Sequence, residues 1–570
     1  MKDCKMTAFE PIKHRENFEE LKENWLFSFD GQAWQPICVP YAPQTELSGI
    51  GHTDFIPKCF YKKTFTVQDN GLRTILHFGA VDYETKVYIN GQFVGEHKGG
   101  YTPFSFDITD ELVQGENLLE LEVLDEFKNV PSGKQSRRPN SFGCFYTRAT
   151  GIWQPVWLEY RPKEYIENFR FYPNVETCSV RVELSVCGKG QYGAEVFFDG
   201  KIVGKVQGET DGKATFEISL SEKHLWSIGK GNLYDVILKF NEDTLHSYFG
   251  LREVKFDGLD FLLNGEKVYQ KLVLVQGYYA DGVYTPKDMQ VVQDDIDFAI
   301  ELGFNGLRLH QKVFDPRYLY LCDKAGVLVW GEFPSWGIDY SNTNSLSEFL
   351  RQWQETMDRD FNHPSIITWC PLNEVWVDWE DPTIKPDIKY VDEVYLYTKA
   401  QDTTRPCVDV SGGYHGHATD LYDFHCYESA DILKKYLDEL EQSDILEVSL
   451  LLDKDKPNRY VAGVPVQISE FGGIAFDASE KENETVNEGA VQNEDSWGYG
   501  KGARDEQSFL ARYKELVDLI GQSKKMSGFC YTQLYDVEQE CNGFRTYDRK
   551  DKLSREGIAQ IKKINDSIEV

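Results

Sequence analysis

Long apolar runs are absent from this 570-residue sequence. No stretch of about eighteen or more apolar residues occurs, so the sequence predicts no membrane-spanning helix. Residues 1–25 also lack the apolar core that a signal peptide carries. We therefore expect a cytoplasmic protein that does not bind a membrane.

Cysteine pairs and nucleotide-binding loops are absent as well. The twelve cysteines are scattered from Cys4 to Cys541 without a C-x-x-C pair, which is typical of buried reduced thiols and not of a disulfide framework or a zinc site. No G-x-G-x-x-G and no P-loop follows an apolar run. We expect neither a metal nor an organic cofactor.

Positive charge is scarce. The chain has 61 Lys and Arg against 93 Asp and Glu, which gives a formal net charge of −32. So acidic a protein repels phosphate backbones and anionic lipids, so nucleic acid is not an expected partner. Neutral ligands such as sugars are favoured, whereas an anionic substrate would require a local basic pocket.

The chain is long enough for roughly three or four domains. Up to about residue 160, short alternating runs are separated by Gly, Asn and Asp, which predicts an all-β sandwich. The Asn90-Gly91 step predicts a two-residue hairpin turn. Alternating runs continue from about 165 to 255, in a segment short enough for a smaller sandwich. We therefore predict β-sandwich domains at 1–162 and 163–255.

A different rhythm begins near residue 256. Short apolar runs now alternate with longer helical patterns: LVLVQGYY, GLRLH, VLVWGEF, IITWCPLNE, CVDVSG, YDFHCY, VPVQISEFG and GFCYTQLYD. Strands that alternate with helices over about 300 residues indicate parallel β/α units. Eight such units predict a closed (β/α)8 TIM barrel at 256–570. An open, doubly wound sheet is the alternative fold.

Two glutamates end apolar runs of this predicted barrel. Glu374 follows Asn373 in IITWCPLNE, and Glu470 ends VPVQISE. The active site of a barrel lies at the carboxyl ends of its strands, and the 96 residues between positions 374 and 470 equal three β/α units, as strands four and seven require. Two facing carboxylates suit glycosidic cleavage, in which one protonates the leaving oxygen and the other attacks the anomeric carbon or activates water. Taken singly, Asn373 and Glu374 also fit a helix N-cap and a first-turn acid.

Polar and aromatic side chains recur at a period of two near other strand ends. They are Arg308 with His310, Asp423 with His425 and Tyr427, and Tyr531 with Gln533. Each of these residues alone is more often structural. A metal site of His310, Glu332 and His425 is an alternative, but it lacks the ligand spacing of zinc sites.

With these residues the chain resembles glycoside hydrolase family 2, the β-galactosidase, β-glucuronidase and β-mannosidase group. The similar barrel stretches are FNGLRLHQKVFDPRYLYLCDKAGVLVWGEF, HPSIITWCPLNE, VPVQISEFGG and SGFCYTQLYDVEQECNG. GYTPFSFDITDELVQGENLLELEV and TGIWQPVWLEY resemble the family's amino-terminal jelly-roll, and YFGLREV resembles the exit of its immunoglobulin-like domain. The resemblance implies a jelly-roll sugar-binding-like domain, an immunoglobulin-like β-sandwich and a catalytic barrel.

The resemblance also implies a retaining, exo-acting mechanism. Glu374 would be the general acid/base and Glu470 the nucleophile. Asn373 would contact the sugar 2-hydroxyl, and Tyr427 would lie beside the nucleophile. We also expect Arg308, His310, His425, Trp497 and Tyr531 to bind the substrate.

The identity of the sugar depends on fewer residues. The N-x-K signature of the family's β-glucuronidases is missing from NGFRTYDRKDK, which favours a β-galactoside unless Arg545 or Lys550 supplies the charge that a uronide needs. Glucuronides, galacturonides, mannosides and arabinosides are the alternatives. Tyr531 replaces the tryptophan that often floors the family's pocket. Trp497 lies in a long loop after strand seven, which we expect to wall it, although an acidic surface loop is the other interpretation.

A function of another class stays open, because a fold does not imply an activity. The sandwich domains would also suit a carbohydrate-binding protein whose barrel is catalytically inactive. The intact pair of glutamates favours an enzyme that acts on a glycoside. Since family members often assemble into dimers or tetramers, the resemblance is compatible with a homo-oligomer.

Overall fold

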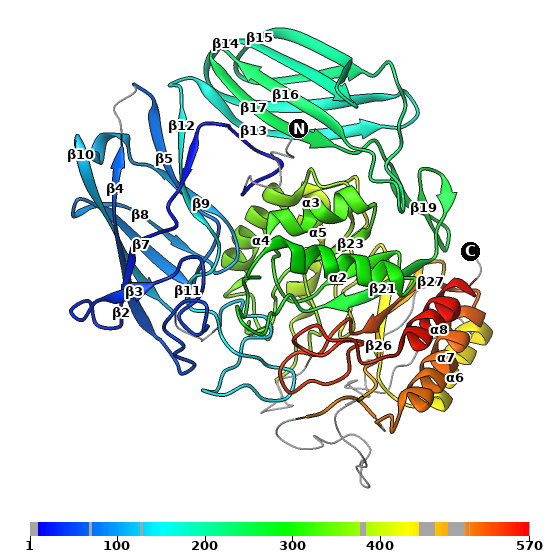
Figure 1. The fold of residues 1–570 in the computed structure, drawn as a ribbon. Helices are drawn as coiled ribbons and strands as arrows, with labels where there is room; N and C mark the ends of the chain where they lie inside the picture. The colour runs from blue at the N-terminus through cyan, green and yellow to red at the C-terminus, as the bar shows by residue number, and fades with distance from the viewer. Residues whose placement is uncertain are drawn as a thin grey trace.

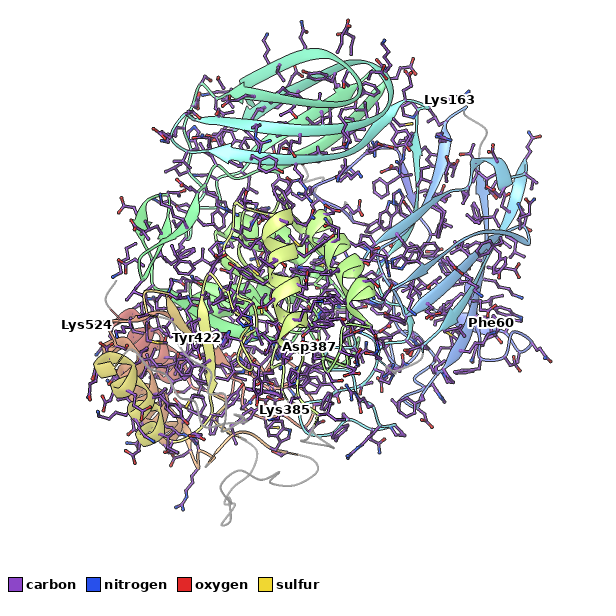
Figure 2. All side chains as sticks on the ribbon, turned by 180° about the vertical axis from the view of Figure 1, so that it is seen from behind. Phe60, Lys163, Lys385, Asp387, Tyr422 and Lys524 are labelled. Carbon is purple, nitrogen blue, oxygen red and sulfur yellow. The ribbon has the colours of Figure 1, made fainter. Side chains whose placement is uncertain are left out.

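The computed structural model describes residues 9–67, 71–125, 129–376, 384–443, 462–476, 496–500 and 502–568. Figure 1 shows two β-sandwiches, drawn in blue to cyan and in turquoise, beside a barrel of β/α units drawn in green to red. In the view from behind, Phe60 lies in the first sandwich, Lys163 at the passage to the second, and Tyr422 in the barrel (Figure 2). The predicted fold class is confirmed. No helix of the described residues is long and apolar enough to cross a membrane.

The first sandwich contains two antiparallel sheets. One has the order β1 (Phe18–Glu20), β12 (Val156–Arg161), β5 (Arg73–Phe78) and β9 (Phe104–Asp107). The other has the order β3 (Gln35–Ile37), β2 (Trp25–Ser28), β4 (Lys58–Val67), β10 (Gly115–Leu124), β7 (Glu84–Ile89) and β8 (Gln92–Lys98). A ribbon of β6 (Val81–Asp82) with β11 (Gly151–Ile152) and the 3-10 helix η1 (Thr109–Glu111) accompany them. In β4, β7 and β10, buried side chains alternate with more exposed ones, as the sequence pattern predicts.

Strand β10 and the turn between β7 and β8 illustrate the predicted features. In β10 the alternate residues Leu119, Leu121 and Val123 are buried in the core. Asn90 and Gly91 connect β7 to β8 with φ angles of 53° and 77°, the positive values that the predicted hairpin turn requires.

The second sandwich is built around one long hairpin. It comprises β13 (Tyr165–Asn174), β14 (Ser179–Phe198), β15 (Lys201–Ser219), β16 (Tyr234–Phe240) and β17 (Asp243–Phe249). The first half of β14 pairs with β13 and its second half with β16, and the register shifts between Ser185 and Lys189. The hairpin therefore passes from one layer to the other. A small sheet of β18 (Val254–Asp257), β19 (Asp260–Leu263) and β20 (Glu266–Lys267) follows and leads into the barrel.

Seven parallel strands form the barrel sheet. Their order is β24 (Ile366–Cys370), β23 (Leu328–Glu332), β22 (Gly306–Leu309), β21 (Gln270–Val275), β27 (Met526–Thr532), β26 (Val466–Gly472) and β25 (Tyr422–Cys426). They correspond to seven of the eight predicted runs. The remaining run makes only isolated parallel bridges, at Cys407 and Ser411, with the segment of β24. Because the Ser411 hydroxyl also lies 3.0 Å from His425 Nε2 on β25, this run closes the ring between β24 and β25.

The helices lie outside the strands. They are α2 (Met289–Glu301), α3 (Pro316–Ala325), α4 (Leu346–Asp360), α5 (Ile388–Gln401), α6 (Ala430–Ser443), α7 (Glu506–Gln522) and α8 (Arg555–Asp566). Apolar side chains inside the barrel, including Leu272, Trp330 and Cys530, pack with Phe261 of β19, so the small sheet covers one end of the barrel. The opposite end, where the strands terminate, is the end that carries the polar side chains.

Candidate active site

The two glutamates lie together at the carboxyl ends of the barrel strands. Glu374 follows the end of β24 by four residues, and Glu470 is part of β26. One oxygen of each carboxylate and one nitrogen of His425 lie within 4.8 Å of one another. The structure thus brings together two carboxylates that are 96 residues apart in the sequence.

A β-bulge on β26 sets the direction of Glu470. Two residues, Ser469 and Glu470, lie opposite the single residue His425 of β25, because Phe424 pairs with Ile468 and His425 pairs with Glu470. A bulge turns side chains away from strict alternation. Both Ser469 and Glu470 therefore bond to residues of the site, although they are adjacent in sequence.

Arg308 on β22 joins the polar groups of the site. Its side chain is fully buried. The guanidinium donates to Glu332 Oε2 at 2.7 Å, to Glu470 Oε1 at 2.8 Å and to Asn373 Oδ1 at 2.7 Å. It also donates to the carbonyl of Ser469 at 3.0 Å. Arg308 therefore fixes the positions of Glu470 and Asn373 and has no exposed surface with which to reach a ligand.

The Glu470 carboxylate is held in its ionised form. Burial by itself would raise the pKa of Glu470, but the positive charges of His425 and Arg308 outweigh it and hold the pKa well below its usual range. The hydroxyl of Tyr427 donates to the second oxygen, Glu470 Oε2, and lies 3.0 Å from Thr532 Oγ1. Thr532 is a residue of the site that the sequence interpretation missed.

His425 connects Glu374 to a chain of hydroxyl groups. Its Nδ1 lies 2.7 Å from Glu374 Oε1, and its Nε2 lies 3.0 Å from Ser469 Oγ. Ser469 has one hydroxyl hydrogen and donates it to Asp423, so its oxygen accepts from His425 Nε2–H. The remaining proton of an imidazolium then lies between Nδ1 and Glu374. Burial lowers the pKa of His425, but the charge of Glu470 and the hydrogen bond to Glu374 raise it above the usual value overall.

Asn373 and Glu374 have unusual local environments. Asn373 is completely buried, and its Nδ2 group has no hydrogen-bond partner among the described residues. Its backbone carbonyl accepts from Trp336 Nε1 at 3.2 Å. Glu374 has a φ of 45°, a strained value for a residue with a side chain, and its N–H donates to the carbonyl of Ser411. The segment 407–412, which was predicted as the fifth strand, thus holds the Glu374 backbone in place.

His310 is buried beside Glu332. Its Nδ1 lies 3.0 Å from Glu332 Oε1, which is an ion-pair distance when the ring is protonated. Burial lowers the pKa of His310, against the opposing charge of Glu332. The alternative metal set of His310, Glu332 and His425 is not the compact group of the described residues, which is Glu374, His425 and Glu470. The oxygens of Glu470 in that group already accept from Arg308 and Tyr427.

Trp497 and Tyr531 differ in position. Trp497 forms an edge contact with Tyr499, whose ring stacks on Tyr427 at a centroid distance of 3.6 Å. The aromatic wall therefore continues to Tyr427, which bonds to Glu470. Tyr531 packs among Phe471, Tyr513 and Phe544. Tyr513 belongs to α7, which covers the outside of the barrel, while the neighbouring Cys530 faces inward. The structure therefore does not place Tyr531 at the floor of the pocket.

Arg545 and Lys550, the two cations considered as partners of a uronide carboxylate, also lie outside the site. Arg545 donates to Asp551 at 2.7 Å and stacks on the ring of Phe298, and the Lys550 side chain is 78% exposed and pairs with Asp548. Neither contacts the two glutamates.

A loop of the first sandwich, residues 129–150, completes the site. In Figure 1 this cyan segment crosses to the barrel and lies beside the red segment that follows β27. Tyr146 donates to Glu540, and Trp497 Nε1 donates to the carbonyl of Gly143 at 2.7 Å. The buried Lys134 lies over the ring of Trp336. No sequence signal marked these contacts, because each joins residues about 200 or more positions apart.

Three family models match this chain. The sugar binding domain of glycosyl hydrolases family 2 matches residues 39–158, the glycosyl hydrolases family 2 model matches residues 164–252, and the TIM barrel domain of that family matches residues 281–472.

Curated relatives and solved structures agree with these matches. A β-galactosidase of Thermoanaerobacter pseudethanolicus is 29% identical over 62% of this chain and 49% of its own length. The β-glucuronidase of Canis lupus familiaris is 28% identical over 63% of this chain and 60% of its own length. The chain thus spans only about half to three-fifths of these relatives. A β-D-glucuronidase structure of Dictyoglomus thermophilum has 21% identity and a TM-score of 0.77, and a β-galacturonidase structure of Eisenbergiella tayi has 20% identity and a TM-score of 0.76. Each alignment covers 98% of both chains, so these structures share the fold.

Proposed function

Because this chain belongs to glycosyl hydrolases family 2, we propose that it is a retaining, exo-acting glycosidase that removes a terminal non-reducing sugar. Glu470 is the nucleophile and Glu374 the general acid/base. The observation that carries the proposal is the short distance, at most 4.8 Å, between an oxygen of Glu374 and an oxygen of Glu470. Retaining enzymes place the two carboxyl groups about 5–5.5 Å apart, whereas inverting enzymes need about 6.5–9.5 Å to admit a water between them.

The environments of the two carboxyls support this division of roles. Glu470 is 5% exposed, ionised and aligned by Arg308 and Tyr427, as a nucleophile must be. Glu374 is 15% exposed at the side chain and shares a proton position with His425 Nδ1, which suits a group that alternately donates and accepts a proton.

The reaction proceeds in two displacements. In the first, Glu374 gives its proton to the glycosidic oxygen while Glu470 attacks the anomeric carbon, so that the bond to the leaving group breaks and a glycosyl ester forms. In the second, Glu374 takes a proton from water, the water oxygen attacks the same carbon, and Glu470 leaves as a carboxylate. Two inversions restore the original anomeric configuration.

The surrounding residues have the chemistry that substrate binding needs. The unpartnered Nδ2 group of Asn373 is a buried donor suited to the 2-hydroxyl of the sugar. His310, His425, Tyr427 and Trp497 keep their proposed places around the sugar, whereas Arg308 acts as a positioning residue through Glu470 and Asn373. The sequence favours a β-galactoside. The curated relatives include both β-galactosidases and β-glucuronidases, so the charge of the pocket has to decide between a neutral and an acidic sugar.

A trapping experiment tests the mechanism. We expect Glu374→Gln, treated with a 4-nitrophenyl β-glycoside, to accumulate a glycosyl ester because the second step lacks its base, and peptide mass spectrometry should map the ester to Glu470. The double variant that adds Glu470→Gln is the matched control and should give no adduct. Glu470→Gln alone should lower kcat by about 10⁴-fold or more. An adduct on another residue, or an inverted first product in the NMR spectrum, would refute the mechanism.

A further inference from the structure

The loop of residues 129–150 is fixed rigidly to the mouth of the barrel. The N–H groups of Ser132 and Gly133 donate to the carbonyl of Trp336 at 2.8 and 3.2 Å. Gly133 has a φ of 56°, and a Cβ there would lie 2.2 Å from the carbonyl oxygen of Gln311, so only glycine allows this close approach. At its other end, the carbonyl of Gly143 accepts from the side chains of Trp497 and Gln539. The loop is therefore a built wall of the site.

This wall carries two buried cations: Arg148, which pairs with Asp125, and Lys134, which lies beside the site. Lys134 is 6% exposed, and its Nζ lies 3.9 Å from the centroid of the Trp336 ring. Trp336 in turn donates to the carbonyl of Asn373, the residue before Glu374. The ammonium group thus stands over a ring that borders the catalytic pair.

Lys134 has no counter-ion of its own within the part of the chain that the structure describes. No carboxylate forms an ion pair with its Nζ there, in contrast to Arg308, which is bonded to Glu332 and Glu470. Burial lowers the pKa of Lys134, but the Cys144 side chain and the carboxyl groups of Glu374, Glu470 and Glu540 outweigh it. The pKa is therefore raised, and the group stays charged at neutral pH. Because the ammonium is charged and forms no direct ion pair among the described residues, it is suited to bind an anionic group of a ligand.

We propose that Lys134 binds the carboxylate of an acidic sugar, and that the enzyme therefore acts on β-glycosides of hexuronic acids. This inference rests on the proposed function and identifies the substrate class of the same site. A chain with a net charge of −32 requires a local cation to hold an anionic sugar, and Lys134 is that cation, in place of Arg545 and Lys550. A neutral sugar would present a hydroxymethyl group, which forms no ion pair with the ammonium.

Matched substrate pairs test this proposal. The 4-nitrophenyl β-D-glucuronide and β-D-glucoside differ only by a carboxylate in place of a hydroxymethyl group, as do the galacturonide and the galactoside. We expect the wild-type kcat/KM to favour the uronide in at least one pair. Lys134→Met should lower the uronide-to-hexoside ratio by about 100-fold or more, because a buried charge loses its partner. Lys134→Arg should retain part of the preference.

Arg138→Met is the matched control. Arg138 lies on the same loop, but its side chain is exposed and stacks on Phe142, so its removal deletes one positive charge without changing the pocket. We expect the ratio to stay within about twofold of wild type, since an exposed charge is screened by solvent.

Failure of the Lys134 proposal and failure of the proposed function give different results. If the wild type prefers the neutral member in both pairs, or if Lys134→Met lowers both members equally, the proposal is overturned while the glycosidase mechanism stands. If no glycoside is hydrolysed, the proposed function itself fails, and calorimetry of free glucuronate and galacturonate against glucose and galactose then tests the binding role. Equal binding of the acids by the wild type and by Lys134→Met would overturn it.

Discussion

Replacement of Arg308 by methionine should change the stability of the protein and the pH dependence of both its stability and its activity. The guanidinium is fully buried and bonds to Glu332, Glu470 and Asn373 at 2.7–2.8 Å. Arg308→Met removes the main cation beside Glu332 and one of the cations beside Glu470, next to His425. Breaking a buried ion pair by removing one partner costs about 3–5 kcal/mol, so we expect the free energy of unfolding at pH 7 to fall by about that amount.

The sign of the pH effect follows from the pKa directions. Burial raises the pKa of Glu332 and Glu470, but the nearby positive charges lower both further, to about 2 for Glu332. A carboxyl whose folded pKa is depressed stabilises the fold above its unfolded pKa of about 4.3, and this contribution is lost as the pH falls through the folded pKa. Since Arg308 provides much of the depression, the stability difference between wild type and variant should be largest near pH 7 and should shrink below about pH 4.

Catalysis should respond in the same direction. The nucleophile must be ionised, so a higher Glu470 pKa in Arg308→Met should move the acidic limb of the kcat/KM profile to higher pH. If methionine prevents folding, Arg308→Lys keeps the charge but loses the planar fork, and it should move the limb less. Urea unfolding as a function of pH and the pH profile of kcat/KM are the two assays.

Arg405 provides the matched control. It is 5% exposed and bonds to Asp402 and to the carbonyls of Phe361, His363 and Ile366, the last being the first residue of β24. Arg405→Met should also lose stability but should leave the acidic limb unchanged. A stability loss below about 1 kcal/mol for Arg308→Met, or equal shifts of the limb in both variants, would refute the reasoning.

Two further predictions concern Glu374 and Tyr531. Glu374→Gln should lower kcat/KM by about 10²–10⁴-fold for alkyl glycosides, which need a proton on the leaving oxygen, but much less for nitrophenyl glycosides; an equal loss for both would contradict the acid role. Tyr531→Ala should lower the free energy of unfolding, measured by urea titration, by about 3–5 kcal/mol, because the ring fills space against Phe471, Tyr513 and Phe544. Tyr531→Phe should stay close to wild type. Neither substitution should change the order in which the enzyme prefers different sugars. A change in the order of preferred sugars would show that Tyr531 lines the pocket.

The proximity of Glu374 and Glu470 could be predicted because it depends on local signals. A buried parallel strand is an apolar run. Glu374 lies four residues after the end of β24, and Glu470 lies near the end of β26. Once the fold is a barrel, all strand ends meet at one face, so a spacing of three units becomes spatial proximity. The boundaries at 162 and 255 stay predictions, although β12 ends at Arg161 and β13 begins at Tyr165.

The facing of individual side chains could not be predicted. All seven residues of β27 are buried, so no alternation of polar and apolar residues marks which face points inward, and Tyr531 was assigned to the pocket where Thr532 contacts Tyr427. On β26 the bulge at Ser469 and Glu470 breaks the period of two that the sequence interpretation assumed. The fifth run fails as a strand because its backbone pairs with β24 only at isolated bridges, while its side chains make the contact with β25.

The contact of the loop of residues 129–150 with the site could not be predicted from the sequence. Net charge alone established that an acidic sugar would need a local cation, and the chain offers 61 lysines and arginines as candidates. The residues beside the predicted barrel mouth, Arg545 and Lys550, were the natural choices and bond to aspartates instead. Lys134 lies 240 positions before Glu374 and in another domain, and only the contacts of Ser132 and Gly133 with Trp336 bring it to the site. Since that loop belongs to the first sandwich, specificity should be lost when the sandwich is separated from the barrel, even where both glutamates keep their places.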